Sequence, residues 1–150
     1  MSEDLARLAT EALCAELEEL RDSLRQITEP LTDEEFWRRP IDPGNSVGHL
    51  VLHLTGNLRH FVGAQLGQSG YIRNREREFT ALDVPGKAEA LAGLDEAVVE
   101  FRRVVSGLTA EQLAAPHPEP RLKGTLKALI HLVAHFALHR GQISYLVRLV

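Results

Sequence analysis

The residues best suited to chemistry are three histidines near the C-terminal end of the chain. His131, His135 and His139 recur every four residues within segment 125–150. On a helix each such step turns by about 400°, so the imidazoles form one slowly drifting stripe. Most of the residues around the stripe are apolar, which predicts a buried helix. Because buried polar groups without partners are costly, these imidazoles need a shared ligand or hydrogen-bond partners.

Distance limits how the three histidines could bind one metal ion. Helical neighbours at i and i+4 have Cβ atoms roughly 5–6 Å apart, close enough to share an ion. His131 and His139 lie about 12 Å apart along the axis, whereas a zinc–nitrogen bond is only about 2.0–2.1 Å long. An ion would therefore take His131 with His135, or His135 with His139, and a further ligand from another element.

A second polar stripe lies in segment 45–67, which begins at Asn45-Ser46, two residue types that favour helix N-termini. His49, His53 and Asn57 share the four-residue spacing there. Helix bundles form metal sites from side chains on facing helices, so the two stripes predict a common site. Three neutral imidazoles with one position left to water are typical of a catalytic ion. Hydrogen-bonded core histidines are the alternative interpretation.

The rest of the chain predicts an all-α fold. Apolar residues at helical spacing also cover segments 3–27 and 87–106. Capping boxes at 32–35 and 109–112 predict short helical turns in the connections. No strand pattern is present, so we expect one domain, residues 1–150, folded as a four-helix bundle. The polar segment 68–86 is long enough to run the length of the bundle, which permits parallel neighbouring helices.

Composition excludes several classes of protein. The 150 residues are 44% hydrophobic and 25% charged, which is ordinary for a globular domain. A net charge of −4 gives no electrostatic case for binding nucleic acid, and no window is apolar enough to span a membrane. The acidic, amphipathic N-terminus does not resemble a signal peptide. With Cys14 as the only cysteine, we expect a reduced, cytoplasmic setting and a core-filling role for that thiol.

Two stretches together resemble the DinB-like (YfiT-like) family of metalloenzymes. They read SVGHLVLHLTGNLRHF and, some eighty residues later, HFALHRGQISYLV. The family is characterised by a histidine in an LxHLxGN helix and by an HxxxH pair that continues into HRGQ. This resemblance covers the whole four-helix plan and implies an up-down-down-up bundle with short helical turns in its connections.

The resemblance also implies one divalent metal ion held by three histidines. Matched position by position, the ligands are His53, His135 and His139. His131 and His49 fall outside the family pattern, and we expect them near the site as supporting or core histidines. Nickel or zinc is the expected metal, with manganese or iron as alternatives.

Characterised relatives in this family are thiol-dependent enzymes, such as bacillithiol S-transferases and the mycothiol-dependent maleylpyruvate isomerase. The resemblance therefore implies a metal-dependent enzyme that transfers a low-molecular-weight thiol to an electrophile. A hydrolase that uses metal-bound water is one alternative. The other is a non-enzymatic dimeric bundle with a structural metal.

Several polar residues are candidates for supporting roles. Asn57 lies one helical turn from His53, and Gln142 lies close to His139, so we expect both to line the pocket or to support the ligands. In segment 68–86, three arginines could attract an anionic thiol or substrate, or simply form a solvated charged loop. These are Arg73, Arg75 and Arg77.

The last helix is apolar up to its final residue. Ile143, Leu146, Val147 and Leu149 follow closely after Gly141, and a single stripe cannot place all of them in the bundle core. We expect a homodimer to cover the excess, because exposed apolar patches commonly mark such contacts. Burial under the connection 107–124 is the alternative.

Overall fold

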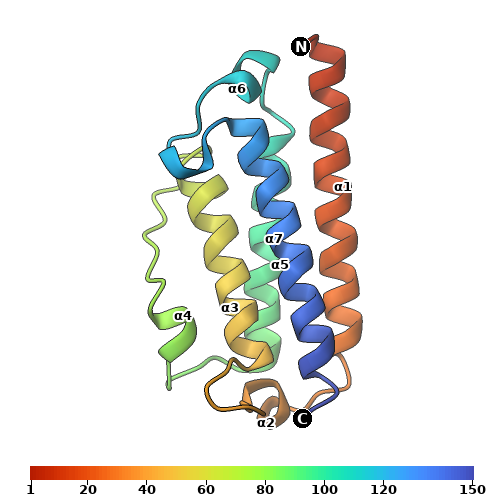
Figure 1. Ribbon diagram of the computed structural model, residues 1–150, viewed down its shortest axis with the longest axis vertical. Helices are drawn as coiled ribbons and strands as arrows, with labels where there is room; N and C mark the ends of the chain where they lie inside the picture. The colour runs from red at the N-terminus through yellow and green to blue at the C-terminus, as the bar shows by residue number, and fades with distance from the viewer.

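The computed structural model describes residues 1–150 and consists of helices and their connections (Figure 1). Four long helices form the bundle: α1 (Glu3–Thr28), α3 (Val47–Leu58), α5 (Lys87–Val105) and α7 (Thr125–Leu146). Shorter elements lie in the connections: α2 (Asp33–Trp37), α4 (Arg77–Thr80), α6 (Ala110–Ala114) and the 3₁₀ turn η2 (Pro120–Leu122). Helix α3 continues into one turn of π-helix, η1 (Arg59–Ala64). The predicted all-α four-helix bundle is confirmed.

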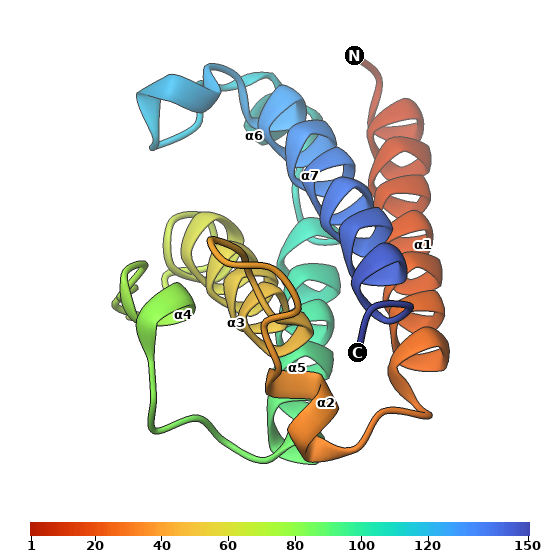
Figure 2. The same ribbon diagram turned by 60° about the horizontal axis from the view of Figure 1, so that its bottom comes forward.

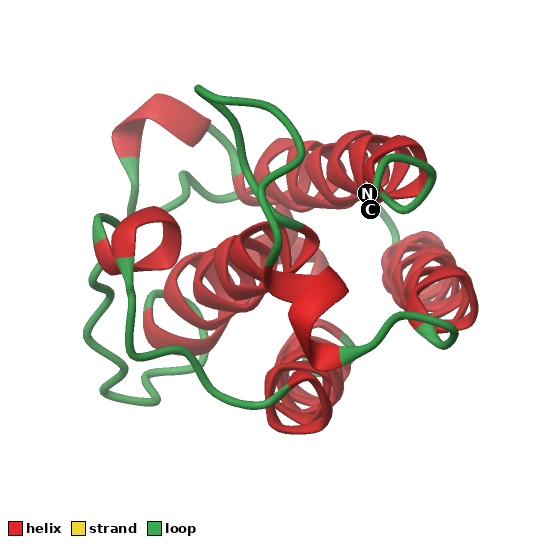
Figure 3. Cartoon of the chain, turned by 90° about the horizontal axis from the view of Figure 1, so that it is seen from below, coloured by secondary structure: helices red, strands yellow, loops and turns green.

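The four long helices alternate in an up-down-down-up order. In Figure 1, α1 runs downward, α3 and α5 both run upward, and α7 runs downward again. Helices α3 and α5 are therefore parallel neighbours, and residues 68–86 return along the outside of the bundle to connect them (Figures 1 and 2). Seen from below, this connection passes outside α3, and no strand is present (Figure 3).

Capping residues fix where the helices begin. The Ser46 hydroxyl accepts the backbone N–H of His49 and so caps α3. Both predicted capping boxes are present, Thr32 with Glu35 at α2 and Thr109 with Gln112 at α6.

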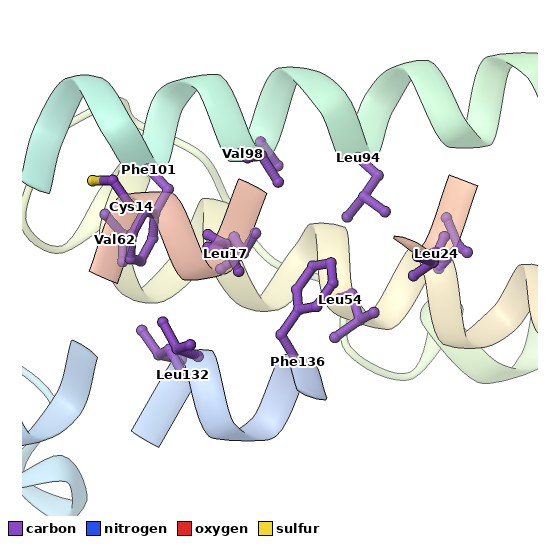
Figure 4. Close-up of a cluster of buried hydrophobic side chains, with 14 of the residues drawn as sticks. Cys14, Leu17, Leu24, Leu54, Val62, Leu94, Val98, Phe101, Leu132 and Phe136 are labelled. Carbon is purple, nitrogen blue, oxygen red and sulfur yellow. The ribbon is translucent and has the colours of Figure 1, made fainter. Parts of the chain in front are cut away.

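The core is a continuous cluster of aliphatic and aromatic side chains between the four helices (Figure 4). Phe101 of α5 and Phe136 of α7 are fully buried in it, and Cys14 is only 1% exposed, as predicted. Burial of such side chains stabilises each by about 1.5–3 kcal/mol relative to leaving it exposed. This core holds α3 and α7 together beneath the histidine stripes.

Helix α7 is not buried on most sides, so that prediction was wrong. Ile130, Leu138 and Tyr145 are more than half exposed, and His131 is exposed as well. The reason is that α7 packs on α1 and α3 with one side only, while α6 and η2 reach only its first turns (Figure 1). The helix also ends at Leu146 rather than at the end of the chain.

None of the helices combines the length and the apolar character needed to cross a lipid bilayer.

Candidate metal centre

Helices α3 and α7 bring three imidazoles together at one point. The Nε2 atom of His135 lies 3.3 Å from Nε2 of His53 and 3.0 Å from Nε2 of His139. One ring nitrogen from each of the three lies within 4.8 Å of the others. His53 belongs to α3 and is 5% exposed, whereas the other two are one turn apart on α7. The two histidine stripes therefore meet at one point in the structure.

Hydrogen bonds at Nδ1 fix which ring nitrogen carries the proton in His53 and His139. His53 Nδ1 lies 2.9 Å from Glu78 Oε2, and His139 Nδ1 lies 2.7 Å from Gln142 Oε1. Because both partners are acceptors, each Nδ1 carries the proton and each Nε2 presents a lone pair. The two Nε2 lone pairs face the same small volume.

His135 completes this cluster of nitrogen lone pairs. Burial, together with the neighbouring His139 and His53, lowers the pKa of His135 to about 4, so the ring is neutral at pH 7. A neutral His135 can donate an Nε2 proton to only one of its two close neighbours. At least one nitrogen–nitrogen pair then has no proton between its atoms, and a shared cation would satisfy all three.

The donor set fits a divalent metal ion. For tetrahedral zinc with Zn–N bonds of about 2.0–2.1 Å, adjacent ligand nitrogens are about 3.3 Å apart. The two close Nε2 pairs, at 3.3 Å and 3.0 Å, approach this separation without movement of the helices. Three protein ligands also leave a position for a substrate atom, as in catalytic sites.

A buried carboxylate from the crossover connection supports His53. Glu78 of α4 is 6% exposed and accepts two hydrogen bonds from Arg73, one to Oε1 at 2.6 Å and one to Oε2 at 2.8 Å. Burial would raise the pKa of Glu78, but the hydrogen bonds from Arg73 and His53 outweigh it and lower the pKa. Glu78 is therefore an anion that holds the Nδ1 proton of His53.

Gly56 makes room for this carboxylate on α3. A Cβ atom at position 56 would lie 2.1 Å from Glu78 Oε1, which is far too close for two unbonded atoms. The glycine costs about 1 kcal/mol of helix propensity relative to alanine. In return, α4 can pack directly on α3 beside His53.

The other expected site residues differ in where they lie. Gln142 bonds to His139, and Asn57 and His131 line a pocket that also borders His135. His131 is exposed rather than part of the core. His49 is not part of the cluster. Its Nδ1 lies 2.5 Å from Ser46 Oγ, and its Nε2 faces the carbonyl oxygen of Ala81.

The three arginines of the connection bind within the chain. Arg73 is paired with Glu78, Arg75 lies over the ring of Phe79, and Arg77 pairs with Asp83. Arg73 is also only 9% exposed as a side chain, so it belongs to no solvated loop. Sequence reasoning missed Glu78, because segment 68–86 has no periodicity that would place it. The signal was the unassigned acceptor that a metal-binding histidine requires.

Two hollows flank the cluster. A pocket of about 420 Å³ borders His135, and its lining residues are Asn57, Phe61, Arg121, Leu122, Lys127, His131, Leu132 and His135. A larger, mostly apolar groove of about 660 Å³ lies towards the C-terminal end of α7 and includes Gln142, Leu138 and Tyr145 in its lining. A molecule in either hollow would lie next to the histidine cluster or to a residue bonded to it.

Comparisons with known proteins give the chain a family and a fold. A family model described as mycothiol S-transferase matches residues 12–148. A conserved protein from Enterococcus faecalis has a similar structure, with 18% identity, a TM-score of 0.76 and coverage of 94% of this chain and 96% of its own. YfiT from Bacillus subtilis, described as a probable metal-dependent hydrolase with an unusual four-helix bundle topology, has 22% identity, a TM-score of 0.73 and coverage of 93% and 86%. A comparison with curated proteins found no match.

We expect removal of one imidazole to abolish metal binding. An ion that binds only the folded state at a hundred times its Kd adds about 2.7 kcal/mol of stability, which raises the melting temperature. Thermal melts of metal-free protein with added zinc or nickel should show this rise, and His135→Ala should lose it. His131→Ala is the matched control, since it removes an imidazole one turn away on the same helix. Full metal occupancy in His135→Ala would contradict the assignment.

We expect Glu78 to strengthen metal binding through His53. Loss of the partner of a metal-bound histidine typically weakens metal affinity about 10–100-fold. Glu78→Gln keeps the shape of the side chain but removes its charge, so competition with a chelator should reveal weaker zinc binding. Glu76→Gln removes an exposed charge from the same segment and should bind zinc like the unaltered chain. Equal affinities for the two variants would show that Glu78 has no such role.

Proposed function

The chain belongs to the mycothiol S-transferase family within the DinB-like group, and on this basis we propose that it is a metal-dependent thiol transferase. It would transfer a low-molecular-weight thiol to a small electrophile. The observation that carries the proposal is a cluster of three imidazole Nε2 atoms beside a pocket, in a chain whose single cysteine is buried. Mycothiol is the first thiol to test, because the family description names it.

We propose His53, His135 and His139 as the ligands of one divalent ion, nickel or zinc in first place and manganese or iron as alternatives. When bound, such an ion would favour the thiolate of a coordinated thiol, whose free pKa is about 8.5. A reduced, cytoplasmic setting is part of this proposal, because a free thiol persists there.

The chain's own groups keep this site ready for an ion. Glu78 holds the proton of His53 on Nδ1, and Gln142 does the same for His139. Both contacts leave the Nε2 lone pairs free and fix the orientation of the rings. Because these partners are already in place, little reorganisation would be needed on binding.

The thiol must come from the substrate. Cys14, the only cysteine, is 1% exposed in the core, and burial raises the pKa of its thiol. A raised pKa and lack of access make a cysteine a poor nucleophile. The chain therefore offers a binding site for a thiol rather than a reactive thiol.

The position of Glu78 favours a transferase over a hydrolase. A metal-dependent hydrolase commonly needs a carboxylate that can take a proton from water. Glu78 is the carboxylate bonded to the cluster, and both of its oxygens accept hydrogen bonds from Arg73 or His53. It is an anchored support for His53 and has no free oxygen to act as a base.

We expect metal-dependent transfer of a small thiol to a chloromethyl arene. The thiol sulfur forms a bond to the benzylic carbon as the carbon–chlorine bond breaks, and chloride and the thiol proton pass to the buffer. Protein loaded with zinc, nickel or manganese should be offered mycothiol and other small thiols, with chloride release as the measurement. Turnover should require metal and disappear in His139→Ala, while His60→Ala, at a histidine that lines neither hollow, keeps it. Metal-dependent hydrolysis of an ester, with no thiol transfer, would replace this proposal.

We also propose a homodimer through the exposed side of α7. The residues expected to be in excess mostly pack into the bundle, since Ile143 is buried and Leu146 and Val147 contact the core. Of that set only Leu149 is exposed. On α7 itself the uncovered apolar side chains are Ile130, Leu138 and Tyr145, which lie along one side of the helix. Their exposure supports an interface between two copies.

Light scattering at high protein concentration tests the dimer. We expect twice the chain mass of 16.7 kDa, and the monomer mass for Leu138→Glu, which places a charge in the middle of the apolar side. Ala92→Glu adds the same charge at an exposed position of α5 and should leave the mass unchanged. A monomer mass for the unaltered chain would exclude the dimer.

A further inference from the structure

The pocket beside His135 is positively charged in a protein with net negative charge. The chain has a net charge of −4, yet the pocket lining contains Arg121 and Lys127 and no acidic residue. The larger apolar groove has no charged residue in its lining. Charge therefore distinguishes the two hollows that flank the histidine cluster.

This pocket is a direct continuation of the histidine stripes. On α7 the four-residue spacing runs from His139 and His135 through His131 to Lys127, and the last two line the pocket. Lys127 lies two helical turns, about 12 Å along the axis, from His135. On α3, which runs antiparallel to α7 (Figure 1), the same spacing leads from His53 to Asn57, which also lines the pocket.

Lys127 is the free cation of the pocket. It is exposed and forms no ion pair within the chain, and it lies in the first turn of α7, where the helix dipole also favours anions. Arg121 is different, because its Nε donates to Glu119 at 2.8 Å and its side chain is 79% exposed. The Glu119 carboxylate offsets much of the charge of Arg121, so Lys127 provides most of the attraction.

Asn57 provides a hydrogen-bonding group nearer the cluster. Its side chain is only 8% exposed, lines the pocket and makes no hydrogen bond within the chain. Its amide is therefore left facing the pocket, where a ligand can pair with it. Phe61 and Leu132 add apolar surface to the lining of the same pocket.

We propose that this pocket binds the electrophile, and that the electrophile is an organic anion with an apolar body and a carboxylate. The carboxylate lies at Lys127, the apolar body against Phe61 and Leu132, and the reactive carbon near His135. Asn57 contacts a polar group of the substrate between these ends. The assignment rests on the proposed thiol transfer for its role, but the binding itself depends only on the pocket.

A pair of inert probes tests the binding. 4-Methylbenzoate and 4-methylbenzamide share size and shape and differ in charge, so calorimetric titration of zinc-loaded protein isolates the effect of the carboxylate. We expect the benzoate to bind about tenfold more tightly, in keeping with a charge-assisted contact. Lys127→Gln should remove this preference, while Lys123→Gln, which removes the same charge four residues earlier and outside the pocket, should keep it.

Two results would overturn the proposal. One is equal binding of the acid and the amide by the unaltered chain. The other is a preference that survives in Lys127→Gln, which would place the carboxylate on the metal instead. Asn57→Asp is a second variant of nearly the same shape, and its added anion should weaken binding of the benzoate far more than that of the amide. A thermal melt checks that it folds, and the exposed Lys127 variant decides the question if it does not.

A reactive pair separates this inference from the proposed function. With 4-(chloromethyl)benzoate and 4-(chloromethyl)benzamide as electrophiles, we expect Lys127→Gln to raise KM for the acid and to leave kcat and both constants for the amide nearly unchanged. Transfer to both electrophiles with equal KM would keep the function and overturn the pocket assignment. Lys127-dependent binding of 4-methylbenzoate without any thiol transfer would keep the pocket and overturn the function.

Discussion

Three imidazole nitrogens with their lone pairs directed at one point are the constraint on which the structure depends. Neutral nitrogens 3.0–3.3 Å apart cannot all be satisfied by the protons available to them. They stay there because the core fixes α3 and α7, and because Glu78 and Gln142 hold the protons on the far side of two rings. The cluster is therefore arranged in advance for a cation, and the cost of the arrangement is carried by the packing of the bundle.

The up-down-down-up topology provides the support that the cluster needs. Parallel neighbours α3 and α5 require a connection that returns along the bundle, and residues 68–86 pass outside α3 as they do so (Figure 2). This route brings Glu78 onto α3 at Gly56, the position where a larger residue would exclude it. A two-residue turn between antiparallel helices could not place a buried carboxylate there, so the unusual order of helices and the chemistry of His53 are linked.

The extent of prediction from sequence follows from what periodicity can encode. Apolar spacing and capping residues predicted the four long helices, and the family resemblance predicted a common site for His53, His135 and His139. The structure contains these helices and places the three histidines together. Glu78 could not be found in this way, because its position depends on a connection without a repeat. The exposure of α7 was also missed, since an apolar sequence does not show which side lacks a neighbour.

The segment that carries Arg121 and Leu122 to the pocket is held in place by His117, a histidine outside both stripes. His117 is 3% exposed, and burial lowers its pKa, so the neutral ring donates from Nε2 to the carbonyl oxygen of Phe61 and accepts the N–H of Glu119 at Nδ1. Phe61 lies in the π-helical turn η1, which continues α3. The ring thus fastens the connection that carries Arg121 to the end of α3. Turn η1 therefore contributes Phe61 to the pocket lining, and the Phe61 carbonyl also binds the segment that carries Arg121 and Leu122.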